Sequence, residues 1–159
     1  MASISLTRIA AVALAAGAAA AAAPVAADPL EDAVQARRGY FRMLALNTGP
    51  LAAMAKAETP YDAEAAAIHA TNLALLGQMN LAHLIPEGTD NAAMPGKTRA
   101  LPSTWSNLED ATAKYEAFTK ASAALAEAAP NGLDALRSAM GALGQSCKSC
   151  HDDYRAKDF

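Results

Sequence analysis

The sequence predicts an all-α protein, an antiparallel up-down-up-down four-helix bundle. The 159-residue chain is 53% hydrophobic, and most of that fraction is alanine and leucine, which are strong helix formers. No stretch alternates apolar and polar residues in the way that predicts a strand. Proline and glycine divide the chain into segments with helical spacing, joined by two short connections and a longer one. Short connections make consecutive helices antiparallel neighbours.

Residues 1–27 are interpreted as a secretory signal peptide. Arg8 is the only charged residue there, the run Ile9–Ala23 is almost entirely apolar, and Val25–Ala27 offers small residues for cleavage at the end of the segment. A membrane anchor that is never cut is the alternative, but the apolar run is shorter than the ~20 residues that a spanning helix needs. We therefore expect a domain over 28–159, exported to the periplasm and free of the membrane after cleavage.

The net charge of the chain limits the kinds of molecule that it is expected to bind. The formal net charge of the chain is −3, and loss of the signal peptide would make it one unit more negative. A mildly acidic domain without a basic run does not predict nucleic-acid binding. The sequence also shows no acid–base pair or activated nucleophile, so we do not expect an enzyme.

Four helices are expected, separated by Thr59-Pro60, by a polar loop over Glu87–Pro102 and by Pro130-Asn131-Gly132. Ser103 is a candidate N-cap for the third helix, and Pro29 suits the first turn of the first. The expected ranges are Pro29–Lys56, Tyr61–Leu84, Ser103–Ala128 and Leu133–Ala156.

Seam residues spaced alternately three and four apart are typical of such a bundle. In the first, third and fourth helices they are Leu30, Val34, Arg37, Phe41, Leu44, Thr48, Leu51 and Ala55; Trp105, Leu108, Tyr115, Phe118 and Leu125; and Leu133, Leu136, Met140, Leu143, Cys147, Cys150 and Tyr154. A guanidinium such as that of Arg37 is costly to bury without partners. Its presence on the seam, together with both cysteines, indicates that the interior holds a cofactor with charged edges.

The motif Cys147-Lys-Ser-Cys150-His151 is the attachment signature of a c-type haem. Residues three apart lie on one face of a helix, so both thiols can reach the vinyl groups of one haem and form thioethers. The next residue turns by ~100° about the helix axis, which directs the His151 imidazole to the iron as an axial ligand. We therefore predict one covalently attached haem c.

Three other interpretations of the motif compete with haem attachment. A thioredoxin-like pair needs a βαβ setting, which is not visible. A zinc site needs a fourth ligand, for which His69 or His83 would be the candidates. A chance occurrence is possible in any chain. The predicted export and the absence of any cysteine outside the motif favour haem.

Essentially all of residues 28–159 resembles the cytochrome c′ family of class II c-type cytochromes. The resemblance rests on the motif near the end of the last helix, on the aromatic and basic pair that follows it, and on the first helix. The residues that carry it are Cys147–Arg155 (CKSCHDDYR), Glu31–Val34, Arg37 and Tyr40-Phe41, with Lys56–Asp62 and Trp105 less diagnostic.

The resemblance implies roles for the remaining site residues. Phe41 takes the distal position, where a phenyl ring cannot bind iron, and Arg37 lies near a propionate or extends to solvent. Trp105 contacts the porphyrin or fills core, and Tyr154 packs on the haem. Arg155 either approaches the proximal face or complements the helix C-terminus.

The implied function is that of a five-coordinate, high-spin haem protein for electron transfer and for binding nitric oxide and carbon monoxide. The alternative is a six-coordinate, low-spin carrier with a methionine ligand, for which Met94 in the long loop is the hardest to exclude. The redox partner is not identified by the sequence. Family members are often homodimers built through the first two helices, where small residues such as Ala52 and Ala66 would allow close approach.

Overall fold

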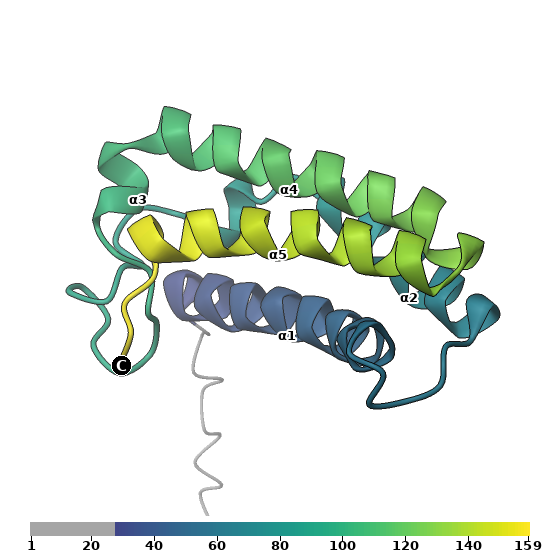
Figure 1. The fold of residues 1–159 in the computed structure, drawn as a ribbon. Helices are drawn as coiled ribbons and strands as arrows, with labels where there is room; N and C mark the ends of the chain where they lie inside the picture. The colour runs from purple at the N-terminus through teal and green to yellow at the C-terminus, as the bar shows by residue number, and fades with distance from the viewer. Residues whose placement is uncertain (1–27) are drawn as a thin grey trace, which may run out of the picture.

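The computed structural model describes residues 28–159; the predicted signal peptide, residues 1–27, lies outside the described part. Four long helices make up the fold: α1 (Pro29–Ala55), α2 (Ala63–Gly77), α4 (Leu108–Ala128) and α5 (Leu133–Tyr154). α2 packs on α1 and α4, and α5 packs on α4 and α1, so the four enclose a common core (Figure 1). This arrangement is the predicted all-α four-helix bundle. α1 begins at the end of the bundle where α5 ends (Figure 1).

The first helix begins where the sequence predicts. Asp28 is the N-cap, its carboxylate accepting a hydrogen bond from the Leu30 amide at 3.0 Å, and Pro29 occupies the first turn. α1 continues through Pro50 and ends at Ala55, one residue before the predicted end. Among the described helices, none combines the length and the apolar character needed to cross a membrane.

The second helix is shorter than predicted. α2 ends at Gly77 instead of Leu84, and only a single 3₁₀ turn, η1 (Ala82–Leu84), follows. Gly77 lies against α4, where a β-carbon would come within 2.6 Å of Ser122 Oγ. The Asn80 side chain accepts a hydrogen bond from the Ala82 amide at 2.9 Å, so a local turn replaces the helix after Gly77.

The third predicted helix is interrupted. α3 (Ser103–Ser106) is a single turn, and Asn107, at φ −130° and ψ 43°, breaks it from α4. Ser103 is not the N-cap, because it is the first helical residue and Pro102 precedes it in the cap position. The connection before α5 is a second 3₁₀ turn, η2 (Ala129–Asn131).

The last helix also ends early, at Tyr154 instead of Ala156. Arg155 has an extended backbone (φ −127°, ψ 121°) and forms an isolated β-bridge with Ala100 of the long loop. The chain therefore leaves α5 along the loop, and the tail and the loop hold each other beside the bundle end.

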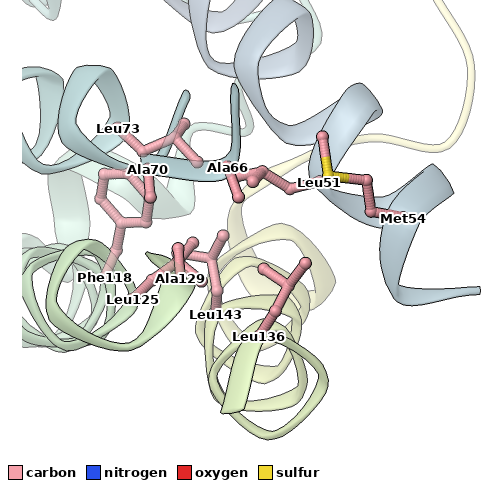
Figure 2. Packing of buried hydrophobic residues seen from close by; sticks show 10 residues of the cluster. All are labelled: Leu51, Met54, Ala66, Ala70, Leu73, Phe118, Leu125, Ala129, Leu136 and Leu143. Atoms are coloured by element: carbon pink, nitrogen blue, oxygen red, sulfur yellow. The ribbon is translucent and has the colours of Figure 1, made fainter. Parts of the chain in front are cut away.

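The hydrophobic core occupies the half of the bundle away from that end. It includes five predicted seam residues and reaches α2 and η2 as well (Figure 2). Its members are Leu51, Met54, Ala66, Ala70, Leu73, Phe118, Leu125, Ala129, Leu136 and Leu143. Three predicted seam residues are exposed instead: Leu30 (38%), Phe41 (45%) and Leu108 (50%).

Candidate functional site

α5 carries the cysteines and the histidine of the motif in its last two turns, and it is an unbroken helix through Tyr154. Cys147 and Cys150 are one turn apart, which places both sulfurs on one face. Both are half-buried free thiols, and Cys147 packs against the hydrophobic core. His151 is half-buried beside them.

Phe41 of α1 faces His151 of α5. The centroids of the two rings are 6.2 Å apart, with an interplanar angle of 60°. The neighbouring Tyr40 points into the bundle, where its hydroxyl donates to the Leu76 carbonyl at 3.1 Å and lies 3.2 Å from the Tyr115 hydroxyl. Tyr40 thus fixes the rotation of α1 that presents Phe41 to the imidazole.

Burial sets the protonation of the three motif side chains. It lowers the pKa of His151, and the nearby positive charges of Arg155 and Arg99 lower it further. Burial also raises the pKa of both Cys147 and Cys150. At neutral pH the imidazole is therefore neutral, with a ring nitrogen able to bind a metal, and the thiols keep their protons.

A family model for cytochrome c′ matches residues 32–155. The chain belongs to the cytochrome c′ family. It is 47% identical over 133 residues to cytochrome c′ of Cereibacter sphaeroides, covering 84% of this chain and 88% of that protein. It is 37% identical to cytochrome c-554 of the same species, with 83% and 86% covered. The structure resembles that of "cytochrome c′ from Rhodobacter Spheriodes" with a TM-score of 0.79 and 46% identity, covering 82% of this chain and 99% of that one.

Members of this family are haem proteins of electron transfer and gas binding, and the chain carries one covalent c-type haem. The residues present fit that group. Two thiols and an imidazole share the end of one helix, and an apolar ring faces the imidazole. A flat ring in van der Waals contact on both sides needs about 7 Å. The Phe41 and His151 rings are in edge-to-face contact, with centroids 6.2 Å apart, so Phe41 has to rotate outward to admit such a ring, and it is exposed enough (45%) to do so.

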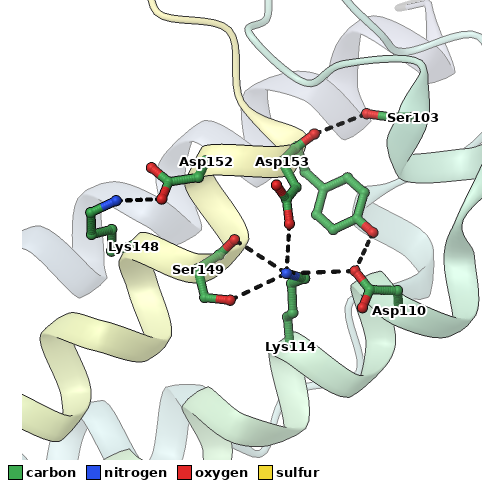
Figure 3. Close-up of polar contacts among 8 residues, drawn as sticks. Ser103, Asp110, Lys114, Lys148, Ser149, Asp152 and Asp153 are labelled. Carbon is green, nitrogen blue, oxygen red and sulfur yellow. Dashed lines mark hydrogen bonds and ion pairs between the residues drawn. The ribbon is translucent and has the colours of Figure 1, made fainter.

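A polar cluster fastens this end of α5 to α4 (Figure 3). Lys114 of α4 donates to Asp153 at 2.6 Å and to the Ser149 hydroxyl at 3.2 Å, and it forms an ion pair with Asp110 at 3.6 Å. The Tyr154 hydroxyl donates to the same Asp110 carboxylate, and that hydrogen bond raises the pKa of Tyr154 to about 12. The cluster therefore holds the turn that follows the Cys-Lys-Ser-Cys-His motif.

The structure places the other predicted site residues around the same end of the bundle. Tyr154 is buried at 7% exposure, and Trp105 of α3 is half-buried, with its indole N–H donating to the Ile85 carbonyl at 2.9 Å. Arg155 is exposed and caps α5. Contacts of Trp105, Tyr154 and Arg155 with haem stay predictions.

Arg37 does not extend to solvent, because it is only 6% exposed. Its guanidinium donates to Thr89 Oγ1 at 3.0 Å, to the Thr89 carbonyl at 2.7 Å, to Thr98 Oγ1 at 2.8 Å and to the Leu84 carbonyl at 3.1 Å. Here Arg37 is an anchor for the long loop. Its predicted place near a propionate stays a prediction.

Sequence reasoning missed Lys114 and its two carboxylate partners, as well as the threonines that bind Arg37. Asp110 and Lys114 stand at the i, i+4 spacing of a helical ion pair, which is a readable signal. Nothing in the sequence indicated that Asp153, from a different helix, would join them. Likewise, no local pattern connects Arg37 to residues 52 and 61 positions along the chain.

Proposed function

We propose that Cys147 and Cys150 hold the haem through two thioether bonds and that His151 is the axial ligand of its iron, in a periplasmic electron carrier that also binds nitric oxide and carbon monoxide. The single observation that carries this proposal is the placement of Phe41 directly across from His151. When bound, the haem supplies an iron that changes oxidation state and has a coordination position for a gas.

The protein's own residues have three tasks in this proposal. The thiols add across the two vinyl groups, each sulfur bonding to one carbon while a proton goes to the other. The neutral His151 imidazole offers its lone pair. Phe41 fills the opposite side with a ring that has no lone pair for iron, so the iron is five-coordinate and high-spin.

Two features support an open sixth position. Phe41 is the aromatic neighbour of His151 on α1, whereas Met43, two residues further on, is exposed and lines a groove with Leu46 and Leu75 on the α1–α2 surface. Phe41 is itself 45% exposed, so it can swing outward to admit a diatomic gas.

Optical spectra of the reduced protein, made in a host that matures c-type haem, test this assignment. We expect a high-spin spectrum and rapid, complete binding of carbon monoxide. A low-spin spectrum with slow or absent binding would support the six-coordinate alternative with a methionine such as Met94. A colourless product with the mass of the bare polypeptide would overturn the haem assignment itself.

A pair of variants tests the geometry. Phe41→Met places a thioether opposite His151, and we expect a low-spin spectrum with slowed gas binding. Phe41→Leu is the matched control, because it keeps an apolar side chain without a ligand atom, and the spectrum should stay high-spin. If Phe41→Met leaves spin state and gas binding unchanged, Phe41 does not face the iron.

We also propose a homodimer formed through α1 and α2. Exposed apolar side chains line a groove of about 420 Å³ there, including Leu46 (72% exposed) and Leu75 (60% exposed). One similar solved structure, 30% identical with a TM-score of 0.74, is described as a cytochrome c′ with "an unusual ligand-controlled dimer dissociation". Sedimentation velocity should show a dimer that Leu46→Lys converts to monomer, while Lys120→Glu on α4 leaves it intact.

A further inference from the structure

Six cationic side chains gather beside the site, although the chain as a whole has a net charge of −3. They come from α1, from the long loop and from the tail after α5, three segments that are far apart in the sequence. We call them the cationic rim, and they are Arg38, Arg42, Lys97, Arg99, Arg155 and Lys157.

Contacts around Phe159 bring four of the six rim residues together. Arg42 lies one helical turn after Arg38 on α1, and Arg155 forms the β-bridge with Ala100, the residue after Arg99. The Phe159 ring has the guanidinium of Arg38 5.7 Å and that of Arg99 5.4 Å from its centroid. Arg99 also donates to the Lys157 carbonyl at 3.0 Å, and Arg38 donates to the Lys97 carbonyl at 3.4 Å. These contacts join α1, the loop and the tail around an aromatic ring that is 68% exposed.

Most of the rim's charge is unopposed. Within residues 28–159 one rim side chain forms an ion pair, Lys97 with Glu31 at 2.9 Å. Asp158 is the acidic side chain of residues 155–159, and it does not lie within ion-pair distance of a rim cation. Cations therefore outnumber anions on this surface.

The rim borders the place where the haem is proposed to bind. Arg42 follows Phe41 on α1, and Arg155 caps α5 one turn after His151. Phe41 and His151, the two residues whose rings face each other, thus each have an arginine close by in the sequence.

We propose that the cationic rim is the docking surface for an acidic redox partner protein, which exchanges electrons with the haem at this end of the bundle. The inference rests on the proposed haem position between Phe41 and His151. Negative charge on the partner would be attracted to the rim, which would speed the encounter and turn the haem site toward the partner. The rest of the protein, which is acidic, would repel the same partner. The rim offers one exposed aromatic residue and no apolar helix face, so it suits an acidic protein surface better than a lipid surface.

The rates at which small charged oxidants react with the reduced protein test the sign of the charge on the surface through which the haem exchanges electrons. Haem attachment is first established by mass and absorbance, and the reduced protein is then mixed with trianionic ferricyanide or with cationic tris(phenanthroline)cobalt(III). We expect the ferricyanide rate to fall with added salt and the cobalt rate to rise, opposite to what the net charge predicts.

Variants locate the effect on the rim. Arg42→Glu should slow ferricyanide about tenfold at ~10 mM ionic strength and by no more than about twofold at ~0.5 M, for charges ~10 Å apart. Arg42→Lys should keep the wild-type rate. Lys120→Glu, on the exposed side of α4, changes the net charge equally and should alter the rate by no more than about twofold.

A polyglutamate competitor tests the partner chemistry. At low salt it should slow ferricyanide oxidation of the wild type and have little effect on Arg42→Glu. If the attached haem reacts with ferricyanide at a rate that rises with salt, or if Arg42→Glu matches Lys120→Glu, the docking surface is wrong while the proposed function stands. Binding to phosphatidylglycerol vesicles without any polyglutamate effect would assign the rim to lipid and overturn the proposal. Protein without attached haem would overturn both.

Discussion

Replacement of Arg37 by methionine tests the loop anchor. Arg37→Met keeps most of the side-chain length and removes the charge with its four hydrogen bonds. The acceptors are buried: Thr89 is 0% exposed and Thr98 is 4% exposed. A methionine at this position leaves those groups without the donor around which the loop is folded.

The four acceptors are not equally affected. The Thr89 hydroxyl keeps its bond to the Pro86 carbonyl, and the Thr98 hydroxyl keeps the Ala100 amide as a donor. The buried Thr89 carbonyl loses its side-chain donor, which costs about 1–3 kcal/mol, and the half-buried Leu84 carbonyl loses its own at a smaller cost. Relief from burying a guanidinium, whose pKa is lowered by burial, offsets part of this. We expect a net loss of about 2–3 kcal/mol, or a melting temperature lower by roughly 10 °C.

Urea unfolding of the haem-loaded protein, followed by circular dichroism, measures the loss. The matched control is Arg42→Met, because Arg42 is exposed and forms no hydrogen bond or ion pair with another side chain of residues 28–159; its effect should stay within about 0.5 kcal/mol. Equal stability of the two variants would refute the anchor. Unchanged stability of Arg37→Met together with a shifted reduction potential would place the guanidinium at a propionate instead.

Three further changes have defined outcomes. Gly77→Ala should cost about 1–3 kcal/mol in urea unfolding because its β-carbon meets α4, while Gly144→Ala, which has no neighbour within 4 Å, should stabilise by ~0.5–1 kcal/mol. The pKa of Tyr154, raised to about 12 by Asp110, means that the folded protein retains a proton which the unfolded chain releases near pH 10. Stability from this group is thus present below about pH 10 and lost as pH rises to about 12, so wild type and Tyr154→Phe should converge in stability over that window. Cys150→Ser should leave the haem joined by one thioether, so mass spectrometry should show haem retained after acid–acetone extraction, whereas loss of both thiols should release it.

The sequence predicted those parts of the fold that depend on periodicity and breakers. The start of α1 at Pro29 and the seam residues Leu51, Leu136 and Leu143 follow from spacing and capping alone. Periodicity did not predict the end of α2, because Met79, Leu81 and Leu84 continue the supply of apolar residues after Gly77 although the chain turns there. That end depends on contact with α4, which is tertiary information.

The candidate site also has parts that the sequence predicted and parts that it did not. The spacing of Cys147, Cys150 and His151 is local, so the sequence alone indicated haem. Arg37 was recognised as unusual for the correct reason, the cost of burying its charge, yet its partners lie in a loop that no helical pattern describes. The cationic rim was invisible for a similar reason: its members are scattered along the chain and meet only where the tail returns beside α1.

The distribution of contacts predicts that the two ends of the bundle differ in how much their stability depends on bound haem. The hydrophobic core lies on the half that holds Leu73, Leu125 and Leu136, whereas the site end is held by polar contacts such as those of Arg37 and Lys114. Apolar burial persists without a cofactor, but polar contacts around an empty haem position compete with water. Hydrogen exchange on protein lacking both thioethers should therefore keep protection in the core helices and lose it first over residues 97–106 and 150–159. Uniform loss of protection along the chain would show instead that the bundle folds only around its haem.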